Sequence, residues 1–223
     1  MKHIVLLTTG GTIAMRQDVP GRGALPSLDQ ADLVGTLSSL SAQVSAEAVC
    51  NLPSSHFSLD TLWTIRERTA SHLQRPDVDG VVITHGTDVM EETAILLDLT
   101  VASNKPIVLT GAMRTASDSG YDGPLNLADA IEVVSSPKVV GAGTLICLDR
   151  RVHAARFVTK THTQALNTFQ SPDWGPVGKL DADGLTFGWQ PERFTIETKR
   201  LEPGVALLRL AVDADPAREP RPG

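Results

Sequence analysis

The stretch IVLLTTGGT at residues 4–12 joins a short apolar run to a pair of glycines and a threonine. Its first four residues favour strands and show no polar alternation, which predicts a strand buried on both faces. Gly10 and Gly11 predict that this strand ends in a tight turn that carries Thr12. Strands of this kind are typical of sheets whose neighbouring strands run parallel.

The same pattern recurs along the chain, with helical segments between the runs. Further candidate strands are residues 81–83, which end at His85-Gly86, residues 107–109, which end at Gly111, and residues 139–148, which Gly141 and Gly143 interrupt. Helix start signals are a capping box of Ser27 and Gln30 before residues 28–40, Ser58 before residues 62–73, Glu91 and Glu92 before residues 94–99, and Pro124 before residues 125–134. Strands that alternate with helices predict an α/β fold.

We therefore predict a Rossmann-like or flavodoxin-like domain, with a mostly parallel sheet flanked by helices and a terminal antiparallel hairpin. Residues 149–151 resemble a turn between two strands, and residues 181–184 resemble a hairpin turn. The domain is expected to span residues 1–190, and the charged, proline-containing residues 191–203 are expected to be a linker. Residues 204–223 cannot form a core of their own, so we expect the truncated start of a second domain or a disordered tail.

Composition excludes several classes of protein. The chain has a formal net charge of −6 and carries no basic run, which argues against a nucleic-acid partner. No segment resembles a membrane span or a secretory leader, and Cys50 and Cys147 lie in apolar stretches typical of buried thiols. We therefore expect a cytoplasmic protein with no membrane association, no cofactor and no metal.

Three segments follow predicted strands and should meet at one edge of a parallel sheet, where such folds bind ligands. They are residues 8–12, 85–88 and 110–114. A phosphate cradle is the rival interpretation, but neither GxGxxG after the first strand nor GxxxxGK[ST] anywhere occurs in the chain. The Gly-Gly-Thr turn alone is also compatible with a purely structural role.

A threonine nucleophile needs a neighbouring group to take its proton. Lys160 lies between β-branched residues in the run VTKT, where partial burial would make its amine usable as a base, although a surface lysine at a strand edge fits the same pattern. Asp88 could bind the ammonium of an amino acid or orient Lys160, or it could cap a helix that begins at Val89.

These residues carry a resemblance to the bacterial L-asparaginases. TTGGTIA at residues 8–14 is similar to the first signature of that family, and ITHGTDVMEETA at residues 83–94 is similar to the second, which is highly specific. Three further motifs, GAMR at 111–114, DGPLNL at 122–127 and VTKT at 158–161, follow in the order of the family. The resemblance extends from residue 1 to about residue 190.

The resemblance implies a hydrolase that converts L-asparagine, with some action on L-glutamine, to the acid and ammonia through an acyl-enzyme. Thr12 would be the nucleophile, and Thr87, Asp88 and Lys160 would assist proton transfer. The residues implied in substrate binding are Gly11, Ser54, Ser55, Gly86 and Ala112.

The chain departs from the family at several points. Secreted relatives commonly carry glutamine where this chain has Ser55, and relatives have a tyrosine in the loop at residues 15–26, where this chain has none. Relatives also have a second, smaller α/β domain that completes a homo-oligomer, so a dimer or tetramer is expected here only if assembly survives truncation. The alternative prediction is a truncated member that is weak or inactive and only binds small amino acids.

Overall fold

The computed structural model describes residues 1–17, 25–37 and 42–205. Within them the central feature is an eight-stranded sheet in the order β12-β11-β8-β7-β6-β5-β1-β4. Its strands in chain order are β1 (Lys2–Thr8), β4 (Ala42–Ala48), β5 (Gly80–Thr84), β6 (Ile107–Thr110), β7 (Thr144–Leu148), β8 (Arg151–Ala154), β11 (Gly178–Asp181) and β12 (Gly184–Phe187). Strands β4, β1, β5, β6 and β7 run parallel, and β8, β11 and β12 extend the sheet antiparallel.

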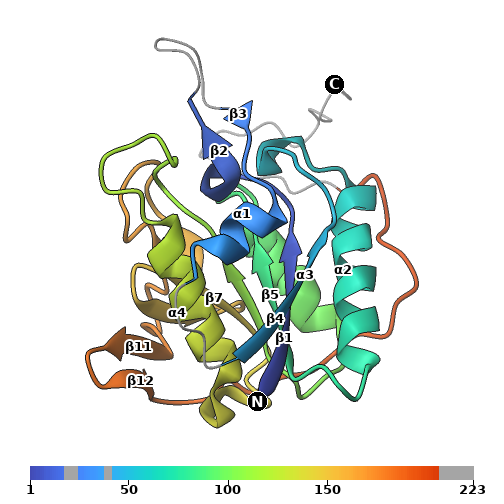
Figure 1. Ribbon diagram of the computed structural model, residues 1–223. Coiled ribbons are helices and arrows are strands. Elements are labelled where there is room, and N and C mark those ends of the chain that lie inside the picture. The colour runs from blue at the N-terminus through green and yellow to red at the C-terminus, as the bar shows by residue number, and fades with distance from the viewer. Residues whose placement is uncertain (18–24, 38–41, 206–223) are drawn as a thin grey trace, which may run out of the picture.

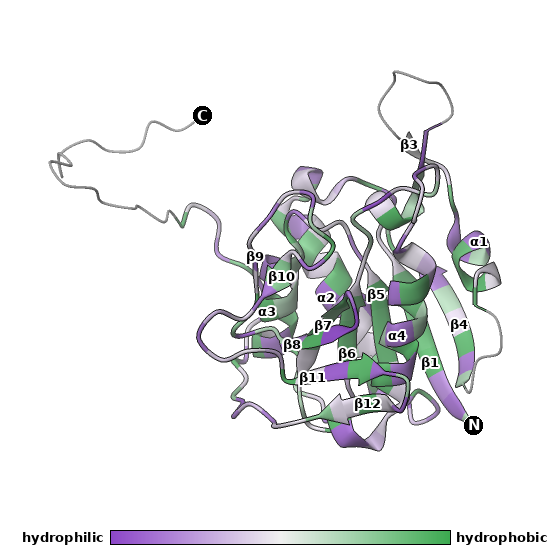
Figure 2. Cartoon of the chain, turned by 90° about the vertical axis from the view of Figure 1, so that its left-hand side faces the viewer, coloured by the Kyte–Doolittle hydropathy of each residue, from purple (hydrophilic) through white to green (hydrophobic). Residues whose placement is uncertain are grey.

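Helices cover both faces of the sheet (Figure 1). Helices α1 (Gln30–Gly35) and α4 (Gly123–Ser135) pack on one face, and α2 (Leu59–Gln74) and α3 (Met90–Thr100) pack on the other. Adjacent residues of β1 point to opposite faces, so Leu6 joins the first core and Leu7 the second, both fully buried. Figure 2 shows the largely hydrophobic strands between these layers. The predicted α/β fold with a mostly parallel sheet is confirmed.

Short elements complete the chain. They are the 3-10 turns η1 (Thr12–Ala14), η2 (Ser54–His56) and η3 (Pro137–Val139), and the two-stranded sheets of β2 (Met15–Arg16) with β3 (Leu25–Pro26) and of β9 (Thr159–Lys160) with β10 (Phe169–Gln170). Both predicted turns are confirmed. Asp149 and Arg150 adopt φ of 48° and 59° between β7 and β8, and Gly184 turns β11 into β12.

Two predicted helix starts are wrong. Helix α1 is capped by Asp29, whose carboxylate accepts the N–H groups of Ala31 and Asp32, and not by Ser27. The N–H of Ser27 instead donates to the carbonyl of Ala14, which keeps that residue in the connection before the helix. Helix α4 begins at Gly123, so Pro124 is its second residue and not its first.

The strand predicted over residues 139–148 is also too long. Only Thr144–Leu148 form a strand, because Gly141 and Gly143 adopt φ of 80° and 82° and turn the chain. Strand β4 was missed, since its sequence AQVSAEA is only partly apolar, as suits an edge strand with exposed positions. Part of the predicted helix at residues 28–40, and the apolar run 205–212 except for Val205, lie outside the described residues.

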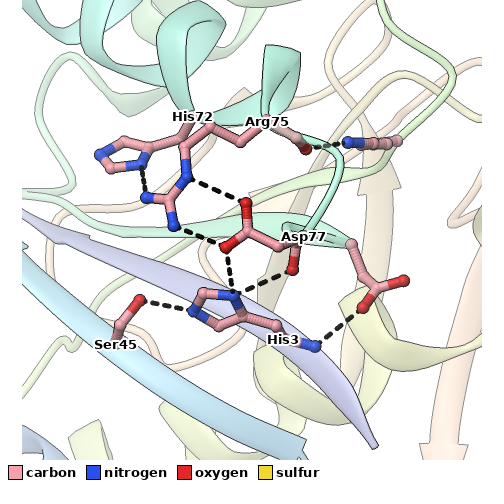
Figure 3. A network of polar contacts seen from close by, with 7 residues as sticks. His3, Ser45, His72, Arg75 and Asp77 are labelled. Carbon is pink, nitrogen blue, oxygen red and sulfur yellow. Dashed lines mark hydrogen bonds and ion pairs between the residues drawn. The ribbon is translucent and has the colours of Figure 1, made fainter.

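At the amino ends of the strands, a polar network ties the edge of the sheet to α2 (Figure 3). His3 on β1 lies 2.8 Å from the hydroxyl of Ser45 on β4, and its Nδ1 lies 2.9 Å from the carbonyl oxygen of Asp77. Arg75, just after α2, donates to the Asp77 carboxylate at 2.6 Å. Polar contacts therefore hold the strands together at their amino ends, whereas the glycine-rich loops lie at their carboxyl ends.

Candidate active site

The three glycine-rich segments meet at the carboxyl ends of adjacent strands. Thr8, Thr84 and Thr110 are aligned across β1, β5 and β6, so the residues that follow them emerge side by side. They enclose a cavity of about 140 Å³. Its lining residues are Gly11, Thr12, Met15, Pro53, Ser54, Gly86, Thr87, Asp88, Ala112, Met113, Lys160 and Thr163. We call this cavity the crevice.

Thr12 opens the 3-10 turn η1 directly after the two glycines. Gly11 has φ of 83°, and a Cβ added there would lie 2.4 Å from main-chain atoms of Gly86. Only glycine fits this close approach between the turn and the loop after β5. The close approach brings the Thr12 turn beside Thr87.

The amine of Lys160 joins the second segment. Its Nζ lies 2.8 Å from Thr87 Oγ1 and 2.8 Å from Asp88 Oδ1. The Lys160 side chain is 16% exposed and that of Asp88 is 60% exposed, so the ion pair sits at the mouth of the crevice. The alternative of a surface lysine is therefore wrong. The alternative of an Asp88 helix cap is wrong as well, because Val89 precedes α3 and no side chain caps it.

Glu91 holds the short strand that carries Lys160. Its carboxylate accepts the hydroxyl of Thr159 at 3.1 Å and the main-chain N–H of Lys160. From the sequence, Glu91 was expected only to place a negative charge at a helix start, a role it also has. Its position in the second motif was the available signal, but the contact depends on how β9 crosses α3.

Ser54 and Ser55 are separated by the fold. Ser54 is buried in η2 at the crevice, and its Oγ accepts the N–H of Asp88 at 3.2 Å. The hydroxyl proton of Ser54 therefore remains available to donate to a ligand. Ser55 is exposed and is not among the lining residues. Gly11, Gly86 and Ala112 all line the crevice, together with the four residues predicted to be catalytic.

Two residues of the DGPLNL motif form hydrogen bonds with the main chain of the third glycine-rich segment, residues 110–114. The Asp122 carboxylate accepts the N–H groups of Met113 and Arg114 at 3.0 and 2.9 Å. The Asn126 amide donates to the carbonyl of Gly111 at 3.0 Å and to Asp122 at 2.9 Å. These contacts fix the Gly111–Met113 loop, and neither residue was assigned a role from the sequence.

The only tyrosine of the chain also reaches the turn that carries Thr12. The hydroxyl of Tyr121 donates to the carbonyl of Ile13 at 2.5 Å. Burial, reinforced by the nearby Asp122 carboxylate, raises the pKa of Tyr121 to about 12. This tyrosine lies beside the turn that carries Thr12, although the loop at residues 15–26 itself contains no tyrosine.

The described residues contain no cluster of three or more histidine, cysteine or acidic side chains that could hold a metal. They also include no helix with the length and apolar character needed to cross a bilayer. The crevice instead presents hydroxyls, one amine, one carboxylate and main-chain N–H groups. Such groups suit a small polar ligand and nucleophilic chemistry.

Comparison with known proteins gives one consistent result. A profile of the asparaginase N-terminal domain matches residues 3–193. The chain is 40% identical to L-asparaginase 2 of Bacillus subtilis over 200 residues, which are 84% of this chain and 51% of that protein. It is 38% identical to a probable periplasmic L-asparaginase of Haemophilus influenzae over 203 residues, 89% of this chain and 58% of that protein.

Comparison with solved structures points to the same family. The crystal structure of a probable cytoplasmic L-asparaginase from Campylobacter jejuni aligns with a TM-score of 0.78 and 33% identity, covering 86% of this chain and 60% of that chain. The chain thus spans little more than half the length of these relatives. Its profile match, identity and fold together show that it belongs to the asparaginase family and corresponds to the family's N-terminal domain.

Proposed function

We propose that the chain hydrolyses the side-chain amide of L-asparagine, with Thr12 as the nucleophile. The proposal rests on one observation above all: Thr12, Thr87, Asp88 and Lys160 line one small crevice, and the Lys160 amine contacts both Thr87 and Asp88 at 2.8 Å. Membership of a family whose relatives are named L-asparaginases supports the reaction class.

In the first step, which requires the Lys160 amine in its neutral form, the Thr12 hydroxyl adds to the amide carbon and its proton passes through the Thr87 hydroxyl to that amine. Collapse of the tetrahedral species breaks the C–N bond, and ammonia leaves with a returned proton. In the second step, water adds to the ester on Thr12 and releases L-aspartate with the threonine hydroxyl restored. Thr87 and Lys160 would act as one unit, because Nζ and Oγ1 share a hydrogen bond.

Negative charge develops on the carbonyl oxygen in both steps, and main-chain N–H groups can stabilise it. In the described part of the chain, the N–H groups of Gly11, Thr12 and Thr87 have no protein acceptor. Their residues line the crevice. They are therefore the donors we assign to the developing oxyanion, with Ala112 forming part of the wall.

Ser54 and Asp88 would hold the amino-acid part of the substrate. The Ser54 hydroxyl has a free proton for the α-carboxylate, and the Asp88 carboxylate can pair with the α-ammonium while it also contacts Lys160. Ser55 is exposed, so we propose at most a contact at the rim. L-Glutamine differs by one methylene, which is worth about 1 to 3 kcal/mol in discrimination, so some glutaminase activity is compatible with this site.

The deciding experiment measures ammonia release from L-asparagine by purified wild type, Thr12→Ala and Thr12→Ser. We expect the alanine variant to be inactive and the serine variant to keep partial activity, since serine retains a hydroxyl. Folding of each variant is checked by thermal unfolding. Ammonia release that survives Thr12→Ala would exclude Thr12 as the nucleophile.

A second candidate function is binding of small amino acids without turnover. The chain aligns with 51% to 58% of its relatives from Bacillus subtilis and Haemophilus influenzae, so binding without turnover is tested beside hydrolysis. Binding alone predicts that L-aspartate raises the melting temperature while L-asparagine yields no ammonia.

A homo-oligomer, dimer or tetramer, remains part of the proposal, and light scattering would measure its mass.

We further propose that residues 1–190 form the catalytic unit, that residues 191–203 link it to the chain beyond, and that the protein acts in the cytoplasm. The relative from Campylobacter jejuni is named cytoplasmic, whereas that from Haemophilus influenzae is named periplasmic. Cell fractionation with an antibody to this domain distinguishes the two locations.

A further inference from the structure

His85 lies directly behind the crevice, in the turn after β5. Its side chain is fully buried, and its ring meets Phe57 edge to face with centroids 5.0 Å apart. Both ring nitrogens have partners. Nδ1 lies 2.6 Å from the carbonyl oxygen of Gly86, and Nε2 lies 2.9 Å from the hydroxyl oxygen of Thr93. The proposed mechanism does not use this histidine.

The partners fix the position of the ring proton. A carbonyl oxygen only accepts, so Nδ1 must carry the proton that is donated to Gly86. Burial lowers the pKa of His85 to about 4, so the ring is neutral near pH 7 and Nε2 has a free lone pair. The Thr93 hydroxyl therefore donates to Nε2. The same hydroxyl also lies 3.0 Å from the carbonyl oxygen of Val89, which accepts the main-chain N–H of Thr93 as well. We assign the hydroxyl proton to Nε2, because no other described group donates to that lone pair.

The hydrogen bond from His85 fixes the direction of the Gly86 carbonyl, and with it the direction of the N–H of the next residue, Thr87. The described chain has no cis peptide bond, and in a trans peptide the C=O and the following N–H point in opposite directions. The carbonyl of Gly86 faces the buried ring, so the N–H of Thr87 faces away from it, on the side of the crevice. Within the described residues this N–H has no protein acceptor.

This peptide needs a constraint because glycine precedes it. Gly86 has no Cβ, and a Cβ there would lie 2.6 Å from Ser54 Oγ, so the residue cannot be replaced by a stiffer one. Glycine permits a wide range of backbone angles, including those that would turn the 86–87 peptide over. The hydrogen bond from His85 opposes that rotation.

We propose that His85, as the neutral tautomer protonated at Nδ1, is a positioning residue that holds the Gly86–Thr87 peptide so that the Thr87 N–H faces the reacting carbonyl of the amide substrate. This inference rests on the proposed amidohydrolase function. It adds a role for Thr93, which keeps the proton on Nδ1 by donating to Nε2.

The variants separate the hydrogen bond from the packing. His85→Phe keeps an aromatic ring against Phe57 but has no donor. His85→Asn places an amide N–H near the position of Nδ1 and can restore the bond to Gly86, whereas His85→Gln places its amide near Nε2 and cannot. Removing one oxyanion donor typically lowers kcat by about 10² to 10³-fold. We expect a kcat loss near the lower figure for Phe and Gln, KM changed less than about threefold, and recovery to within about tenfold of wild type for Asn.

A spectroscopic measurement needs no variant. Nitrogen-15 NMR of the wild-type histidine rings at pH 7 should show His85 neutral, with its proton on Nδ1. Thr93→Val removes the donor to Nε2 without touching Nδ1, and we expect a shifted Nε2 resonance and a smaller loss of kcat than in His85→Phe.

The outcomes are distinguishable. A wild-type chain that releases no ammonia overturns the proposed function and this role with it. Wild-type kcat in a folded His85→Phe, or a proton found on Nε2, overturns the role of His85 alone. If His85→Phe does not fold, two measurements still test the role of His85. They are the tautomer of the wild-type ring from nitrogen-15 NMR and the kcat of Thr93→Val compared with wild type.

Discussion

Glu91 accepts the main-chain N–H of Lys160, although 69 positions separate the two residues. The contact ties the first turn of α3 to β9, a strand of only two residues, and so places the Lys160 amine against Thr87 and Asp88. A carboxylate that was expected only at a helix start therefore also orders the proposed catalytic group.

Replacing Glu91 should weaken catalysis more than folding. In Glu91→Ala, β9 loses both acceptors and Lys160 is no longer held in place, so we expect kcat to fall at least about tenfold, as misplaced catalytic groups typically do. Glu91→Gln keeps one acceptor and should lose less. The matched control is Glu92→Gln, which removes a charge from the same helix turn and has no contact with β9 among the described residues. Equal losses in Glu91→Ala and Glu92→Gln would contradict the assignment.

Tyr121→Phe tests the hydrogen bond that anchors the turn carrying Thr12. The variant removes the hydrogen bond to the carbonyl of Ile13 and keeps the ring, so we expect a stability loss of about 1 kcal/mol and a several-fold lower kcat with little change in KM. Urea unfolding and the ammonia assay measure the two effects. A variant with unchanged kcat would leave Tyr121 with packing alone.

The ionisation of Tyr121 can be followed directly, since it is the only tyrosine. Burial raises its pKa from 10.0 to about 12, so the folded chain should form no phenolate near pH 10.5, whereas the unfolded chain should be more than half ionised there. Because the folded-state pKa is the higher one, the contribution of Tyr121 to stability is present below pH 10 and is lost as pH rises toward 12. Absorbance at 295 nm, with and without guanidinium, measures this difference.

His153 should make the domain less stable in mild acid. Burial lowers the pKa of His153 from 6.5 to about 4, and its Nε2 has no partner within the described residues. Between these values the unfolded chain binds a proton that the folded chain does not, so stability is full above pH 6.5 and falls toward pH 4, by about 1.4 kcal/mol per unit. His85 acts in the same direction.

Asp129 opposes this trend, because burial raises its pKa from 3.8 to about 6 and the folded chain binds that proton first. We therefore compare wild type with His153→Asn by urea unfolding from pH 4.5 to 7.5, which cancels the terms from His85 and Asp129. The variant should show a shallower loss of stability below pH 6.5. Parallel curves for the two proteins would exclude His153 as a source of acid sensitivity.

Among the ion pairs of the described residues, the two that Asp98 forms should contribute most to the free energy of unfolding. Its carboxylate is buried on α3, contacts Arg156 and Arg193 at 3.0 Å each, and accepts the N–H of Thr144 at 3.1 Å. Asp98→Ala leaves two arginines without their partner, and breaking a buried pair costs about 3 to 5 kcal/mol. Lys2→Ala, which breaks the exposed pair with Asp79 and leaves the bond from the His3 N–H to Asp79 in place, should cost less than about 1 kcal/mol. Chemical denaturation of both variants tests the contrast.

The same contact bears on the predicted linker. Arg193 lies in residues 191–203, yet it is bound to Asp98, and the N–H of Ile196 donates to the carbonyl of Leu99 at 2.6 Å. The charge and prolines of residues 191–203 predicted a linker, and composition does not reveal which charges have partners. The beginning of this segment packs along α3.

Local patterns were sufficient for much of the fold. The apolar runs of β1, β5 and β6, the cap at Ser58 and the turn at residues 149–150 depend on burial, side-chain hydrogen bonds and backbone angles within a few residues. They could therefore be predicted. Strand β4 and the Asp29 cap could not, since a partly exposed edge strand has no strong apolar pattern and two residues near α1 could each serve as a cap.

By itself, the sequence determined the α/β class, the strand-end motifs and the family, because these depend on residue type, spacing and order along the chain. Only the tertiary structure decided that Lys160 binds Thr87 and Asp88, that Glu91 holds β9, and that Tyr121 reaches the turn that carries Thr12. Each of these contacts joins residues about 70 or more positions apart. Their geometry depends on how the sheet and its crossing loops align, and spacing along the chain does not encode that alignment.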